Sequence, residues 1–196
     1  MIKADDQQYI RLVREGDTNA FAVLVDRYKD MVFTLSLKML KDREEAEEVS
    51  QDTFLKIYKS LNKFNGESKF STWIYKVAFN TCLDRLKKNK RSQPVTTLDD
   101  FNEQEAISLI NVLDLIEERE RKKMIQDCLQ WLPGEDSFLL TLYYFEEQSL
   151  EEIATIIGIN PNNVKIRLYR SRKKLMALLK EHLEPEILQY YERERR

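Results

Sequence analysis

The sequence predicts an all-α fold, with two small helical domains joined by a flexible acidic linker. Apolar residues recur every three or four positions over much of the chain, which is the spacing of amphipathic helices. No segment shows the sustained alternation of a β-strand. Only four glycines and four prolines occur among the 196 residues, and such sparse punctuation is typical of helices connected by short loops. A chain that is 42% hydrophobic and 34% charged can build cores and is not disordered as a whole.

The first domain is expected at residues 1–92 and contains three predicted helices. The first has a stripe of apolar residues at helical spacing: Phe21, Leu24, Tyr28, Met31, Leu35 and Met39. Asp42, followed three residues later by Glu45, predicts the capped start of the second helix. A loop around Gly66 separates it from the third, which is expected from about Ser71 to about Lys90.

The linker is expected at residues 93–120. It begins as a polar, proline-containing stretch without a strong hydrophobic period. It contains eight acidic residues and a single basic residue, Arg119. Helical periodicity returns from about Ile125, which places a second domain at 121–184. Residues 185–196 form a charged tail to which we assign no role.

A helix-turn-helix is predicted in the second domain. Ser149 and Glu152 have the spacing of a capping box, which opens a short helix. Gly158 then supplies the positive φ that a helix C-terminus often requires. Asn160 and Pro161 form an N-cap and first-turn pair for the next helix. A short helix, a glycine turn and a longer helix are the parts of this DNA-binding motif.

The longer helix has a buried side and a basic side. The buried side is expected to contain Val164, Leu168, Ser171, Leu175 and Leu178. Opposite it lie Ile166, Tyr169, Arg170 and Lys173, with the flanking bases Lys165, Arg167, Arg172 and Lys174. Bases around an exposed apolar side chain fit a helix in the DNA major groove. A solvated cationic helix is the alternative, but the capped helix-turn-helix before it favours DNA binding.

The third helix of the first domain has a second candidate surface for nucleic acid. One sector combines Trp73, Lys76, Asn80, Leu83 and Lys87, and the loop before it offers Lys63, Asn65, Lys69 and Phe70. Aromatic rings with neighbouring cations bind unpaired bases. For Trp73 alone, a place in the core is about as compatible with the pattern. The basic end from Lys87 to Arg91 is the firmer indication of nucleic-acid binding.

The second helix is expected to present an acidic ridge. Glu44, Glu48, Gln51 and Leu55 recur at helical spacing beside Asp52. DNA would be repelled by this ridge, so it fits a basic protein partner better, although a solvated face has the same spacing.

The sequence lacks the residues that several other classes of function require. Two distant cysteines and one histidine suggest no metal site, and we find no phosphate loop or nucleophile–base pair. We therefore expect no catalytic residues and no cofactor. Neither a signal peptide nor a membrane-spanning run is recognisable, so we expect a soluble cytoplasmic protein without membrane insertion.

Together these segments resemble the extracytoplasmic-function (ECF) sigma factors of the bacterial sigma-70 family. Region 2.2 of that family resembles DREEAEEVSQDTFLKIYKSL, and regions 2.3 and 2.4 resemble FSTWIYKVAFNTCLDRLKKNKR. Region 4.2 resembles LEEIATIIGINPNNVKIRLYRSRKKL. The three motifs occur in the family's order and spacing, and the resemblance as a whole covers most of the chain.

The resemblance implies roles for individual residues. Polymerase binding, through the β′ clamp helices, is implied for Glu48, Gln51 and Asp52. Opening and reading of the −10 element is implied for Asn65, Lys69, Phe70, Trp73, Lys76, Asn80, Lys87, Lys88, Lys90 and Arg91. Reading of the −35 element is implied for Lys165, Ile166, Arg167, Tyr169, Arg170 and Lys173. Glu48 stands where the family often has Asp.

The expected function is therefore transcription initiation: binding core RNA polymerase, recognising both promoter elements and helping to melt DNA. The expected partners are core polymerase (β′ clamp helices and β flap), promoter DNA and an anti-sigma factor. One alternative is a helix-turn-helix regulator that binds an operator as a dimer without joining polymerase. Another is a protein-interaction adaptor whose basic patches are incidental.

Overall fold

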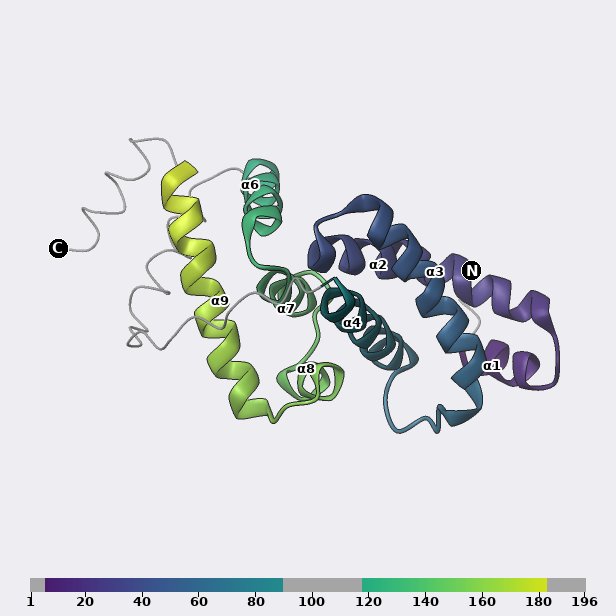
Figure 1. Cartoon of the computed structure of the whole chain (residues 1–196). Coiled ribbons are helices and arrows are strands. Elements are labelled where there is room, and N and C mark those ends of the chain that lie inside the picture. Colours follow the sequence, from purple (N-terminus) through teal and green to yellow (C-terminus); the bar gives the residue numbers. More distant parts are fainter. Residues whose placement is uncertain (1–5, 90–117, 183–196) are drawn as a thin grey trace.

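The computed structural model describes residues 6–89 and 118–182. Within these ranges every regular element is a helix (Figure 1), which confirms the all-α prediction. The elements, in chain order, are α1 (Asp6–Arg14), α2 (Thr18–Leu40), α3 (Arg43–Ser60), the short 3₁₀ helix η1 (Leu61–Lys63), α4 (Phe70–Lys88), α6 (Glu118–Trp131), α7 (Gly134–Tyr144), α8 (Leu150–Ile157) and α9 (Pro161–His182).

The amino-terminal half, α1 to α4, encloses its own apolar core. That core contains Ile10, Val13, Ala20, Leu24, Val32, Ile57, Leu61, Phe64, Phe70, Ile74 and Ala78. Helix α1 was not predicted, because nine residues give too few turns for a periodic pattern. Arg14 at its end donates to the Leu61 carbonyl at 3.0 Å and so ties α1 to η1.

The helix boundaries in this half follow the capping residues of the sequence. Asp17 caps α2 through the amides of Asn19 and Ala20. Asp42 accepts from the Glu45 amide at 3.0 Å, which confirms the predicted start of α3. Helix α4 begins and ends within two residues of the expected bounds.

The carboxy-terminal half begins earlier than the sequence indicated. Helix α6 begins at Glu118, inside the expected linker of residues 93–120, rather than near Ile125. Helical structure is interrupted between α6 and α7 at Leu132 and Pro133, and Gly134 is the first residue of α7. The rest of the expected linker and the 185–196 tail lie outside the described residues.

The two halves pack against each other, which the sequence did not predict. Helix α4 lies beside α7 and α8 in Figure 1, and α2 also contacts α7. One continuous apolar cluster extends from Leu35 and Phe79 in the first half to Phe138 and Leu168 in the second. The rings of Phe79 and Phe138 are 5.0 Å apart between centroids.

Candidate nucleic-acid interface

The helix-turn-helix has the capping geometry that its sequence predicts. The Ser149 hydroxyl accepts from the Glu152 amide, and the Glu152 carboxylate accepts from the Ser149 amide, which completes the capping box. Gly158 ends α8 with φ of 73°, in the left-handed region. Asn160 then accepts from the Asn163 amide at 2.8 Å, at the start of α9. These local contacts fix the turn between the two helices.

Helix α9 is held by the face that was predicted to be buried. Val164, Leu168 and Ser171 are almost inaccessible, and Leu175 is 9% exposed. Asp136 on α7 accepts from the Ser171 hydroxyl and from the Lys174 ammonium, both at 2.6 Å. Asp136 was not predicted from the sequence, although a carboxylate in the first turn of α7 is favourable.

The opposite face of α9 is open to solvent. Ile166 is 49% exposed, an unusual place for a large apolar side chain. Lys165, Arg167 and Lys173 are exposed as well, and Tyr169 and Arg170 are partly buried. The six residues predicted for the −35 element therefore lie on or beside one surface.

Two bases next to this face have partners within the protein. Arg167 forms a 3.5 Å ion pair with Glu135 on α7. Arg172 lies over the rings of both Tyr143 and Tyr144, at 5.1 and 5.4 Å from their centroids. Because its guanidinium lies over these two rings, Arg172 is not free to extend towards a DNA phosphate in this conformation.

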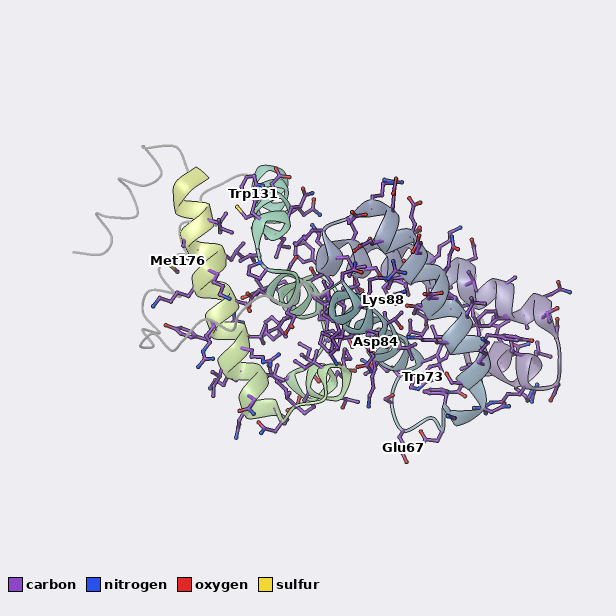
Figure 2. The ribbon with its side chains drawn as sticks, viewed as in Figure 1. Glu67, Trp73, Asp84, Lys88, Trp131 and Met176 are labelled. Carbon is purple, nitrogen blue, oxygen red and sulfur yellow. The ribbon has the colours of Figure 1, made fainter. Side chains whose placement is uncertain are left out.

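The second candidate surface lies on α4 and the loop before it. Lys76, Asn80, Lys87 and Lys88 are exposed along the helix, and Asn65 and Lys69 are exposed in the loop. Figure 2 shows Trp73 on α4 near the loop that carries Glu67. Lys90 and Arg91, the end of the predicted basic run, lie outside the described residues.

The aromatic part of this surface is layered. Phe70 is only 4% exposed, so its ring is shielded from any base in this conformation. It stacks on Trp73 at 5.8 Å between centroids, and Phe64 contacts both rings. Trp73 is partly buried, so it both packs on the core and reaches the surface. Phe64 was not among the residues predicted from the sequence.

Lys69 joins the two candidate surfaces. Its ammonium lies 2.9 Å from the carboxylate of Glu152, the capping-box residue of α8. This contact, followed by the hydrogen bond from the Ser149 amide, lowers the pKa of Glu152 below its ordinary value. A residue assigned to one DNA element is thus paired with the helix-turn-helix.

The acidic ridge lies on α3 as predicted. Glu44, Glu48, Gln51 and Asp52 are exposed, and Leu55 is 56% exposed. Glu48 pairs with Arg85 on α4 at 2.8 Å. The ridge therefore adjoins the basic helix and presents apolar as well as acidic atoms to solvent.

Within residues 6–89 and 118–182, no group of three or more potential metal ligands occurs. In the same part of the chain, no helix is both long and apolar enough to cross a membrane.

Comparison with known protein families identifies both halves. Residues 24–92 match Sigma-70 region 2, and residues 122–175 match Sigma-70, region 4. The chain is 34% identical to the ECF RNA polymerase sigma factor SigW of Bacillus subtilis, over 88% of this chain and 95% of that protein. It is also 34% identical to the RNA polymerase sigma-H factor of Pseudomonas aeruginosa, over 92% of this chain and 99% of the relative. The protein belongs to the sigma-70 family, in its ECF group.

Solved structures share the fold. CnrH, solved in complex with the cytosolic domain of CnrY, has a TM-score of 0.57 at 21% identity, over 90% of this chain and 97% of its own. RpoE of Bartonella quintana, solved with the anti-sigma factor NepR, has a TM-score of 0.56 at 17% identity, over 82% and 96%.

Proposed function

We propose that this protein joins core RNA polymerase, directs it to promoters through −10 and −35 elements and helps to melt the DNA. The observation that supports this function best is the combination of three surfaces on one chain. They are the exposed face of α9, the basic and aromatic face of α4, and the acidic ridge of α3. A helix-turn-helix alone defines a broader class of regulator.

The −35 element is assigned to the exposed face of α9. Lys165, Arg167, Arg170 and Lys173 provide cations for phosphates and guanine edges, and Tyr169 adds a hydroxyl. Arg167 exchanges its exposed pair with Glu135 for a phosphate at little cost, because such pairs stabilise by less than about 1 kcal/mol.

Ile166 is the proposed source of −35 base preference. It is 49% exposed at the centre of this face, where an apolar side chain can meet a thymine methyl. Ile166→Ala should change the −35 base preference in a binding assay with a randomised element and leave helicity intact. An unchanged −35 base preference would refute this assignment of Ile166.

The −10 element is assigned to α4 and its preceding loop. Trp73 offers a ring on which an unpaired base can stack, and Asn80 offers an amide for a base edge. Four lysines are proposed to contact the DNA backbone: Lys69, Lys76, Lys87 and Lys88. Asn65 adds a polar side chain in the loop, and Lys90 and Arg91 continue the basic run in the sequence. Phe70 supports Trp73 from below, because it is buried against that ring.

Polymerase binding is assigned to Glu48, Gln51 and Asp52, which fit a basic helical surface such as the β′ clamp helices. A second contact of the carboxy-terminal half, with the β flap, follows from family membership. An anti-sigma factor is a further proposed partner, since the similar RpoE was solved with one. The protein acts by binding rather than catalysis, needs no cofactor and works in the cytoplasm.

Addition of the purified protein to core polymerase on a genomic template library tests this function. Transcripts with defined start sites are expected, and they should disappear when Glu48 and Asp52 are both changed to Lys. A complete absence of specific initiation by the wild-type protein would refute the function. A dimeric regulator, the alternative class, would instead bind paired half-sites without polymerase.

A further inference from the structure

The loop of residues 64–69, which is proposed to help read the −10 element, begins at a peptide group that α1 holds. Arg14, the last residue of α1, donates from Nη2 to the Leu61 carbonyl at 3.0 Å and also to the Phe64 carbonyl. The Leu61 carbonyl accepts from the Phe64 amide as well, at 3.2 Å, which closes the turn of η1. One guanidinium group therefore binds both carbonyls of the turn from which the loop leaves.

The Phe64 carbonyl sets the direction of the chain beyond it. This carbonyl lies in the same planar peptide group as the Asn65 amide, so its orientation fixes ψ of Phe64, which is 110°. Before this peptide group, the buried Phe64 ring packs on Phe70 and Trp73. After it, the exposed loop begins with Asn65. Arg14 therefore acts at the point where the aromatic layer and the polar loop meet.

Beyond this point the loop is folded on itself. The Asn65 side-chain oxygen accepts from the Glu67 amide at 3.3 Å. Gly66, between them, has φ of 80°, in the left-handed region that favours glycine. Because these features are local, they shape the loop but do not place it on the protein. Its far end is fixed by the start of α4 at Phe70, so its near end is where a contact can shift the Asn65 side chain.

Helix α1 is itself a fixed support. Ile10 and Val13 are buried in the core of the amino-terminal half. Asp6, the first residue of α1, accepts a hydrogen bond from the Tyr28 hydroxyl on α2. The Tyr28 ring in turn meets the ring of Phe70 edge-on, 5.8 Å away between centroids. Both ends of α1 are therefore connected to the aromatic layer from which the loop extends.

We propose that Arg14 is a positioning residue for the −10 element. By holding the Phe64 carbonyl, it keeps Asn65 and the rest of the loop in the place needed to read an unpaired base. This inference rests on the proposed function, because it requires that the loop contacts the −10 element. Arg14 lies outside residues 24–92, which match Sigma-70 region 2, so the family match does not include it.

The test measures −10 base preference in holoenzyme formed from core polymerase and the full-length protein. The DNA is a fork with a double-stranded −35 element and an unpaired, randomised −10 strand, and the bound sequences are counted. Arg14→Ala removes both hydrogen bonds that orient the loop. It should lower the discrimination between favoured and disfavoured −10 bases roughly five- to tenfold. On a second fork with a randomised −35 element, the −35 base preference should stay that of the wild-type protein.

Arg11→Ala is the matched control. Arg11 lies one turn earlier on α1, is exposed, and pairs with Glu15 just beyond the helix at 3.9 Å. Each variant removes one positive charge from α1, but only Arg14→Ala removes the two hydrogen bonds to the turn of η1. Arg11→Ala should therefore keep the wild-type −10 base preference.

Two further variants separate hydrogen bonding from folding. Arg14→Lys keeps a cationic donor at this position, so it should recover part of the −10 discrimination. Arg14→Met keeps the aliphatic stem and a high helix propensity but has no donor. It therefore decides the outcome if Arg14→Ala loses helicity.

Salt dependence distinguishes positioning from direct contact with DNA. A side chain that binds a phosphate of a single strand contributes about 0.7 to the slope of log K against log salt concentration. Its loss weakens binding to all sequences alike. Loss of a positioning residue changes the base preference and leaves the salt slope equal to that of Arg11→Ala, which is the result we expect for Arg14→Ala.

Two outcomes would overturn the inference while leaving the proposed function intact. One is an unchanged −10 base preference in holoenzyme with folded Arg14→Ala or Arg14→Met. The other is a uniform loss of affinity with a shallower salt slope, which would make Arg14 a phosphate ligand. A wild-type protein that forms no complex with core polymerase, or a wild-type holoenzyme that selects no −10 sequence, contradicts the proposed function itself.

Discussion

Replacement of Trp73 separates its structural role from its proposed role in holding an unpaired base. Its ring packs on Phe70 and Phe64, at 5.8 and 5.5 Å between centroids, and part of it remains accessible. Trp73→Ala removes roughly 100 Å² of buried apolar surface, which costs about 2.5 kcal/mol of unfolding free energy. For the amino-terminal half, residues 6–89, a loss of that size lowers the melting temperature by about 10 °C or more.

The DNA effect is additional to this loss of stability. Stacking of a base on an aromatic ring contributes about 1–3 kcal/mol, so loss of Trp73 should lower open-complex stability by roughly 5- to 150-fold. Trp73→Phe keeps an aromatic ring and should recover most of it. The assay is permanganate reactivity of promoter thymines, measured well below the melting temperature of each variant.

Trp131→Ala is the matched control, because Trp131 is 53% exposed and lies on α6, away from the aromatic layer. It should cost less stability and leave promoter opening unchanged. Promoter opening by folded Trp73→Ala at the wild-type level would contradict a stacking role for Trp73.

Three further predictions concern single contacts. Ser149→Ala removes half of the capping box and should lower the unfolding free energy by about 1 kcal/mol, measured by urea denaturation, whereas an unchanged midpoint would contradict the capping geometry. Asp136→Asn weakens the contacts to Ser171 and Lys174 and should lower −35 binding and thermal stability together, so loss of binding at full stability would contradict an anchoring role. Burial raises the pKa of Cys82 and Cys128 from 9.0 to about 11; the folded state therefore holds protons that the unfolded state releases, and stability should be full below about pH 9 and fall towards pH 11. Cys82→Ala should make that decline shallower in pH-dependent denaturation, and an identical slope would contradict the shift.

Local chemistry made the helix-turn-helix predictable. Ser149, Gly158 and Asn160 each fix the backbone within a few residues, so short patterns were sufficient. The buried stripe of α9 followed from periodicity because that helix is long. The same holds for the acidic ridge on α3, whose residues proved to be exposed.

Contacts between distant segments were not predictable. Gly134 is the first residue of a helix, and its close approach to the Met39 backbone, which leaves no room for a Cβ atom, is a contact with the other half of the protein. Phe70 was expected among the DNA-binding residues, but it packs beneath Trp73, since a pattern of aromatics does not say which ring lies on top. Tyr75 and Phe79 are paired across the two halves with residues more than 50 positions away, and periodicity carries no such information.

Mapping of transcript 5′ ends tests the proposed function most directly. Core polymerase is incubated with genomic DNA, with and without the purified protein. The prediction is a set of new 5′ ends preceded by two shared sequence elements near −10 and −35, lost when Ile166, Arg170 and Lys173 are together changed to Ala on otherwise stable protein. Start sites identical to those of core polymerase alone would contradict it.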